Sequence, residues 1–160
     1  PKENNVINII PESKELGYVG KPKKINKEKI LNFINNKQIP IVVPLGLGDD
    51  GRIYNINADV AAGSIAKEID ARRLLLMTDV EGVLDENQKL ISEINLNRAN
   101  EMLKNNIISG GMIPKINTCL DAISNGVRGV VIVDGRKPHS ILFELFSDKG
   151  AGTLIRKWII

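Results

Sequence analysis

Three short segments place polar side chains where α/β proteins bind ligands, either directly after an apolar run or directly before a helix. Residues 54–59 (YNINAD) bring two amides and a carboxylate to the start of a helical pattern. Residues 78–84 (TDVEGVL) follow an apolar run, and residues 109–115 (SGGMIPK) precede a second helical pattern. These groups suit sugar hydroxyls, amines and phosphates as ligands.

The third of these segments favours an anion. Gly110 and Gly111 allow the backbone to approach a ligand, and Pro114 suits the first position of a helix. Lys115 then adds a positive charge to a helix start that is already electropositive. Because a nearby anion would offset this unfavourable placement, we interpret Lys115 as a phosphate-binding residue. A lysine with no ligand is the alternative.

The second segment has the residue types of a nucleoside site. Asp79 is able to accept hydrogen bonds from a ribose or an amine, and Val80, Val83 and Leu84 are able to wall an apolar slot for a flat base. An ordinary turn is the alternative. In the first segment, Asn57 and Asp59 are also good helix caps, so this segment alone does not separate capping from ligand binding.

Taken together, the three segments indicate phosphoryl transfer, because they combine a slot for a base, an anion-attracting helix start with a lysine, and carboxylates that order cationic groups. The chain has no Walker loop, no GxGxxG fingerprint, no zinc-ligand spacing and no Ser-His-Asp set. Its single histidine is His139. We therefore expect no metal site built by the protein's own side chains.

Apolar runs alternate with helical periodicities along the chain, which predicts an α/β fold with a mainly parallel sheet covered by helices. Buried strands are expected at residues 41–45, 74–77 and 130–133, and a closing strand is expected at residues 153–155. Helices are expected after Asn26, over residues 59–69, 96–103 and 116–123, and from Pro138, the last one packed by Ile141, Leu142 and Leu145. The first twenty residues predict a short hairpin, and the lysine-rich residues 21–29 predict a solvated loop and helix start.

Composition narrows the class of protein. The 160 residues are 42% apolar and carry a net charge of +3, with both signs interleaved along the chain, which argues against a nucleic-acid partner. The single cysteine, Cys119, and the absence of a leader or of an apolar run of membrane-spanning length predict no membrane association and a cytoplasmic location, or an organelle stroma. A chain that opens at Pro1 is expected to be a fragment.

The order and spacing of the motifs resemble those of the acetylglutamate kinases. The resemblance rests on residues 55–59 (NINAD), 78–84 (TDVEGVL) and 110–115 (GGMIPK), and residues 131–136 (VIVDGR) and 150–153 (GAGT) extend it. It implies the amino-acid kinase fold, a three-layer α/β/α sandwich. Residues 1–70 would then be the end of the lobe that binds acetylglutamate, and residues 71–160 the lobe that binds ATP with Mg²⁺.

The resemblance also implies residue roles. Lys115 and Asp59 would be catalytic: Lys115 would neutralise charge on the transferring phosphoryl group, and Asp59 would orient the two catalytic lysines. Asn55 and Asn57 would bind N-acetyl-L-glutamate. The residues that would frame the nucleotide are Asp79, Val80, Gly82, Val83, Leu84, Ile107, Ile108 and Ser109.

Two further expectations follow from the same resemblance. His139, Glu144, Gly150 and Gly152 resemble the site at which the arginine-inhibited members bind arginine as a feedback inhibitor. The whole protein would be a homo-oligomer, a dimer or a hexamer. The family's glycine-rich loop and second catalytic lysine have no counterpart in this chain, so the chain alone is expected to be inactive. Another amino-acid kinase, acting on carbamate, glutamate or uridylate, and a non-catalytic nucleotide-binding module are the alternatives.

Overall fold

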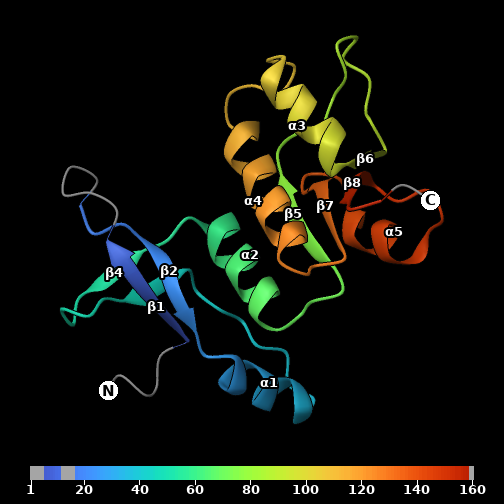
Figure 1. Ribbon diagram of the computed structural model, residues 1–160. Helices are drawn as coiled ribbons and strands as arrows, with labels where there is room; N and C mark the ends of the chain where they lie inside the picture. Colours follow the sequence, from blue (N-terminus) through green and yellow to red (C-terminus); the bar gives the residue numbers. More distant parts are fainter. Residues whose placement is uncertain (1–5, 12–16, 159–160) are drawn as a thin grey trace. The chain divides into compact units, whose positions relative to one another are not determined.

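The computed structural model describes residues 6–11 and 17–158. The chain divides into two compact units, Pro1–Asp70 and Ala71–Ile160, and each is described by itself (Figure 1). The assignment of acetylglutamate to the first part of the chain and of ATP to the second remains a prediction.

The first unit holds a four-stranded sheet with the order β2-β1-β3-β4. Strand β1 (Ile7–Pro11) pairs antiparallel with β2 (Gly20–Ile25) and parallel with β3 (Leu45–Leu47). Strand β4 (Ile53–Asn55) pairs antiparallel with β3. Two helices complete the unit, α1 (Lys27–Asn35) and α2 (Ala58–Glu68), and α2 packs against β2.

Local signals in the sequence account for both helices of this unit. The Asn26 side chain accepts a hydrogen bond from the backbone N–H of Lys29, as expected of the cap of α1. Helix α1 buries Ile30 and α2 buries Ala61 in one cluster with residues of the sheet. The other buried members of this core are Ile7, Ile25, Tyr54 and Ile56.

Two predictions for this unit are wrong. Residues 41–43 form no strand, and the Ile41 side chain is 93% exposed, because Pro40 and Pro44 flank the segment and lack the N–H groups that a sheet ladder needs. The expected loop within residues 21–29 is instead strand β2. This strand lies at the edge of the sheet, where lysine and proline are tolerated and protect the edge. A hairpin is present, but its second strand is β2 and not the expected residues 16–19, of which Leu16 lies outside the described residues.

The second unit holds a sheet with the order β5-β7-β8-β6. Strand β5 (Leu74–Thr78) is parallel to β7 (Gly129–Asp134), and β6 (Glu93–Asn95) is parallel to β8 (Gly152–Arg156). Strands β7 and β8 are antiparallel. The central strand β7 is buried along its whole length, which agrees with its continuous apolar sequence.

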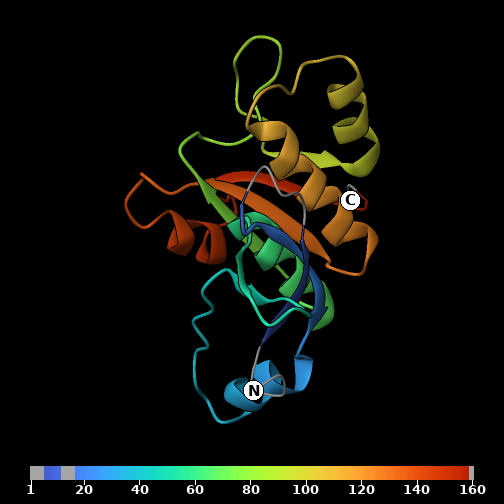
Figure 2. The same ribbon diagram turned by 90° about the vertical axis from the view of Figure 1, so that its left-hand side faces the viewer.

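Three helices cover this second sheet, and both views show them as layers. Helix α4 (Met112–Ser124) lies on one face and α5 (Ser140–Phe146) on the other, while α3 (Leu96–Lys104) packs beside α4 (Figures 1 and 2). Helix α4 buries Ile116, Cys119 and Ile123, as its spacing predicts. The predicted α/β class, with helices on both faces of a sheet, is confirmed.

Two details of the helices differ from prediction. Helix α4 begins at Met112, so Pro114 occupies its third position rather than its first. The expected apolar face of α5 is not packed: Ile141 is 40% exposed and Leu142 and Leu145 are each 53% exposed. The reason is that this short helix turns Ser140 and the Glu144 side chain inward, so the large apolar side chains face away from the sheet. None of the helices among the described residues is long and apolar enough to cross a membrane.

Candidate functional site

The carboxyl ends of β5 and β7 bring two polar segments side by side. Thr78 and Asp134 are partners in the parallel ladder, and the N–H of Gly135 donates to the carbonyl oxygen of Thr78 at 2.8 Å. Asp79 therefore follows β5 at the same edge at which Asp134 ends β7. Ligands of parallel sheets bind at this edge, so its side chains are the first candidates for a site.

Asp134 and Arg136 form a bidentate ion pair at this edge. Arg136 Nε donates to Asp134 Oδ1 and Arg136 Nη2 to Asp134 Oδ2, both at 3.0 Å, and the backbone N–H of Arg136 also donates to Oδ1. The hydrogen bonds from the Arg136 side chain, and after them the one from its backbone N–H, lower the pKa of the Asp134 carboxyl from 3.8 to about 2. Asp134 is therefore a buried carboxylate that stays charged at neutral pH.

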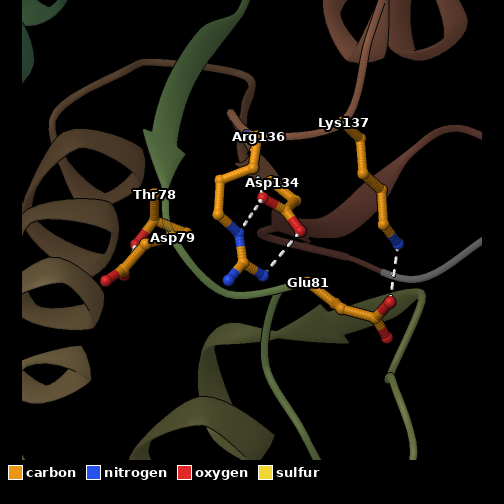
Figure 3. Close-up of polar contacts among 6 residues, drawn as sticks. All are labelled: Thr78, Asp79, Glu81, Asp134, Arg136 and Lys137. Atoms are coloured by element: carbon orange, nitrogen blue, oxygen red, sulfur yellow. Dashed lines mark hydrogen bonds and ion pairs between the residues drawn. The ribbon is translucent and has the colours of Figure 1, made fainter.

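A second ion pair extends the same cluster. Lys137 Nζ lies 2.6 Å from Glu81 Oε1 and so joins the turn after β7 to the loop after β5 (Figure 3). The Thr78 hydroxyl donates to Asp79 Oδ1 at 3.3 Å. We call the set Thr78, Asp79, Glu81, Asp134, Arg136 and Lys137 the strand-end cluster.

Hydrogen bonds from a residue of β8 hold the predicted nucleotide loop to the second sheet. Thr153 is fully buried, and its hydroxyl accepts from the N–H of Val83 at 2.8 Å and donates to the carbonyl oxygen of Ile91 at 2.6 Å. Gly82 has φ +150°, and a Cβ there would lie 2.6 Å from Thr153 Oγ1, so glycine is required. Asp79 and Val80 are exposed and Leu84 is half-buried, whereas Val83 is 1% exposed and packs in the core.

The start of α4 lies at the same edge of the second sheet. The short segment 125–128 connects α4 to β7, so the helix runs opposite to the strand and its N-terminal end lies at the strand's carboxyl end. A Cβ at Gly110 or Gly111 would meet no atom within 4 Å, so a ligand has room beside this backbone. Lys115 is half-buried in the first turn of the helix.

The three residues that precede these glycines differ in exposure. Ile108 is buried, Ile107 is half-buried and Ser109 is exposed. Of these predicted nucleotide residues, Ser109 therefore offers a side chain to a ligand, whereas Ile108 supports the segment from the core.

The predicted substrate residues lie in the first unit, around the start of α2. Asn55 is exposed in β4, and its N–H donates to the carbonyl oxygen of Tyr18 at 2.7 Å. The Asn57 side chain caps α2, accepting from the N–H groups of Asp59 and Val60 at 3.0 and 3.2 Å. The capping alternative for Asn57 is thus realised, which leaves its amide nitrogen for other partners. Asp59 is half-buried in the first turn of α2.

A pocket of about 380 Å³ lies beside α5 and contains most of the predicted arginine residues. Glu144, Gly150 and Gly152 line it, whereas His139 is not among the lining residues. The Glu144 side chain is 6% exposed; Arg73 Nη1 donates to its Oε1 at 3.1 Å and the N–H of Ala151 to its Oε2 at 3.0 Å. The carboxylate therefore already binds a guanidinium group.

Gly152 has a structural role as well. A Cβ at this position would lie 2.0 Å from the carbonyl oxygen of Ile132, so only glycine lets β8 pair with β7 here. Its presence in the chain is therefore explained without any ligand.

The sequence prediction assigns no ligand role to Asp134, Arg136 or Lys137, and it includes Glu81 only as part of segment 78–84. A signal was available, because Asp134 directly follows an apolar run, and Asp79 follows another after one residue, Thr78. What the sequence does not contain is the register that sets Asp134 opposite Thr78.

Comparison with known proteins gives a consistent assignment. The model of the amino acid kinase family matches residues 3–134. The acetylglutamate kinase of Pelagibacter ubique is 59% identical over 156 residues, which are 98% of this chain and 54% of the relative. That of Clostridioides difficile is 50% identical over 159 residues, 97% of this chain and 56% of the relative. The chain thus spans about half the length of the curated relatives it matches.

Solved structures agree on the fold. The protein smu.665 from Streptococcus mutans has a TM-score of 0.79 at 36% identity, over 94% of this chain and 56% of that one. N-acetylglutamate synthase from Neisseria gonorrhoeae has a TM-score of 0.88 at 24% identity. The match covers 97% of this chain and 37% of the synthase chain. The latter similarity concerns the fold alone.

Proposed function

The chain belongs to the amino acid kinase family, and from that premise we propose that it is the C-terminal part of an ATP-dependent kinase that phosphorylates the γ-carboxylate of N-acetyl-L-glutamate. The observation that carries the proposal is that Asp79 and the start of α4, with Lys115, both lie at the carboxyl ends of the parallel strands of the second sheet. Relatives named acetylglutamate kinase at 59% and 50% identity support this acceptor over the other acceptors of the family.

The residues at this edge fit a nucleotide. Open space beside Gly110 and Gly111 leaves the backbone accessible to phosphate oxygens, and the electropositive start of α4 favours negative charge. The exposed carboxylate of Asp79 suits a hydroxyl or amino group. Mg²⁺ accompanies ATP in phosphoryl transfer and supplies charge neutralisation to the phosphates.

We assign the chemistry of the chain's own residues as follows. Lys115 contributes positive charge where negative charge develops on the transferring group, and no protein nucleophile is needed because the acceptor carboxylate attacks directly. Asn55 and the free amide nitrogen of Asn57 are donors for the carboxylates or the acetyl group of the acceptor. For Asp59, the role of orienting the two catalytic lysines rests on the resemblance alone.

The first test uses the whole protein, with the N-terminal half that its relatives possess. We expect ADP release that requires N-acetyl-L-glutamate and is not supported by carbamate, glutamate or uridylate. Lys115→Ala should lower kcat by roughly 10²-fold or more, with a smaller effect on the KM for acetylglutamate, because charge stabilisation is lost mainly in the transition state.

Lys104→Ala is the matched control, since Lys104 is an exposed lysine in the last turn of α3. An effect of Lys115→Ala on KM alone would make Lys115 a binding residue. Equal activity of both variants would remove it from the mechanism.

We further propose that arginine inhibits the whole enzyme by binding in the pocket lined by Glu144, Gly150 and Gly152. Two observations support this. Glu144 accepts a guanidinium from Arg73 in this structure, and the pocket lining holds two more carboxylates, those of Asp148 and of Glu93, which pairs with Arg156. A bidentate pair between guanidinium and carboxylate would select arginine over lysine. His139 lies outside this pocket lining, so its effector role rests on the resemblance alone.

A further inference from the structure

Asp134 binds one edge of the Arg136 guanidinium, and the rest of the group is exposed to solvent. Asp134 binds its Nε and Nη2 atoms, and the Asp134 side chain is only 3% exposed, whereas the Arg136 side chain is 65% exposed. A fork–fork pair of this kind fixes the orientation of the guanidinium plane. The outward part of the group, including Nη1, is thus presented to solvent in one fixed orientation.

This fixed guanidinium lies beside the predicted nucleotide loop. The N–H of Gly135 holds the turn before Arg136 to Thr78, and the pair between Lys137 and Glu81 holds the turn after it (Figure 3). The carboxylates of Asp79 and Glu81 are close enough to contribute to the raised pKa of Arg136, after the larger effect of Asp134. Arg136 and Asp79 therefore belong to one surface.

The charge of this surface decides which ligand group suits it. Asp79, Glu81 and Asp134 carry three negative charges, while Arg136 and Lys137 carry two positive ones, and both cations are already in ion pairs. A triphosphate gains little from such a surface. A planar, uncharged aromatic group gains more, because a guanidinium stacks on aromatic faces without giving up its in-plane hydrogen bonds.

We propose that Arg136 stacks on the base of the nucleotide, as a binding residue that Asp134 orients. This inference rests on the proposed nucleotide site of the second unit. It gives Asp79 and Arg136 complementary roles: the carboxylate accepts hydrogen bonds from the ribose or the amino group, and the guanidinium covers one face of the base. The phosphates are left to the start of α4.

The test is a calorimetric titration of the 160-residue chain with adenosine, ADP and ATP. Arg136→Met removes both the planar guanidinium and its charge. It should weaken the binding of all three ligands by the same factor, about threefold to thirtyfold, which is the range of a stacking contact between a cation and an aromatic ring. Arg136→Lys keeps the charge but not the plane, and should weaken them similarly. Arg128→Met is the control, because Arg128 is exposed at the opposite end of β7.

Removal of Arg136 alone leaves the buried Asp134 carboxylate without its partner, which could unfold the chain. The double variant Asp134→Asn/Arg136→Met avoids this, and should show the same parallel loss. A loss for ATP with none for adenosine would make Arg136 a phosphate ligand and overturn the proposal, as would unchanged binding of all three. Failure of the wild-type chain to bind any of them would instead reject the nucleotide site itself.

Discussion

At the scale of single residues, Asp134 shows how a buried charge is kept in an apolar setting. It ends a strand whose six residues are all buried, and it is 2% exposed, yet three hydrogen bonds from Arg136 satisfy its oxygens. Burial alone would raise the pKa of a carboxyl group, and the hydrogen bonds from Arg136 outweigh this effect and lower the pKa of Asp134.

This pair makes stability depend on pH in a defined window. The pKa of Asp134 is about 2 in the folded chain and near 3.8 when unfolded, so its contribution is fully present above about pH 4 and is lost as the pH falls towards 2. Asp134→Asn should lower the free energy of unfolding at pH 7, and the difference from wild type should shrink between pH 4 and pH 2. Urea unfolding across this range measures it.

Asp148→Asn is the comparison, since Asp148 is exposed. Its effect should be small and should not follow the same window. A difference between wild type and Asp134→Asn that stays constant down to pH 2 would contradict the assigned pKa.

At the scale of elements, Thr153 joins the predicted nucleotide loop to the sheet. Thr153→Val keeps the shape but leaves the N–H of Val83 and the carbonyl oxygen of Ile91 without this partner. We expect a loss of about 1–3 kcal/mol in the free energy of unfolding, the cost of buried polar groups left unsatisfied. Faster amide exchange in the loop 80–91 than in β7 should accompany it.

Thr118→Val provides the matched control. The hydroxyl of Thr118 donates to the carbonyl oxygen of Pro114 within its own helix, at a more exposed position. Its replacement should change stability by about 0.5 kcal/mol or less. Equal effects of the two substitutions would show that Thr153 does not support the loop.

At the scale of the whole molecule, the chain carries about half the length of its acetylglutamate kinase relatives. We expect the isolated chain to bind ATP but to release no ADP in the presence of acetylglutamate, because the resemblance places a glycine-rich loop and a second lysine in the other half. Adding the N-terminal half as a separate polypeptide should restore turnover. Robust turnover by the isolated chain would refute this.

Regulation belongs to the same scale. In the whole enzyme, Glu144→Ala should raise the arginine concentration needed for half inhibition by about tenfold or more, as expected when a charge-assisted pair is lost. Glu144→Gln keeps the volume and should act in the same direction. Two superimposed inhibition curves, or a wild type that arginine does not inhibit, would sink the proposal.

Much of the second unit is predictable from the sequence because its signals are local. The buried run of β7, the spacing of α4 and the cap at Asn26 in the first unit each depend on residues that are near one another in the chain. The motifs at Asp79 and Lys115 are readable for the same reason, since each directly adjoins an apolar run or a helix. Linked motifs in a fixed order also identify the family.

The tertiary structure alone decided which distant residues meet. Strand β2 is a strand because β1 pairs with it, although its lysines and its proline favour a loop. Residues 41–43 are the exception, because Pro40 and Pro44, which withhold donors from a ladder, can be read in the sequence itself. The strand-end cluster depends on the register of β5 against β7, which arises from the packing of the whole sheet. Pairing between strands far apart in sequence leaves no local pattern, and for that reason Arg136 could be placed beside Asp79 only in three dimensions.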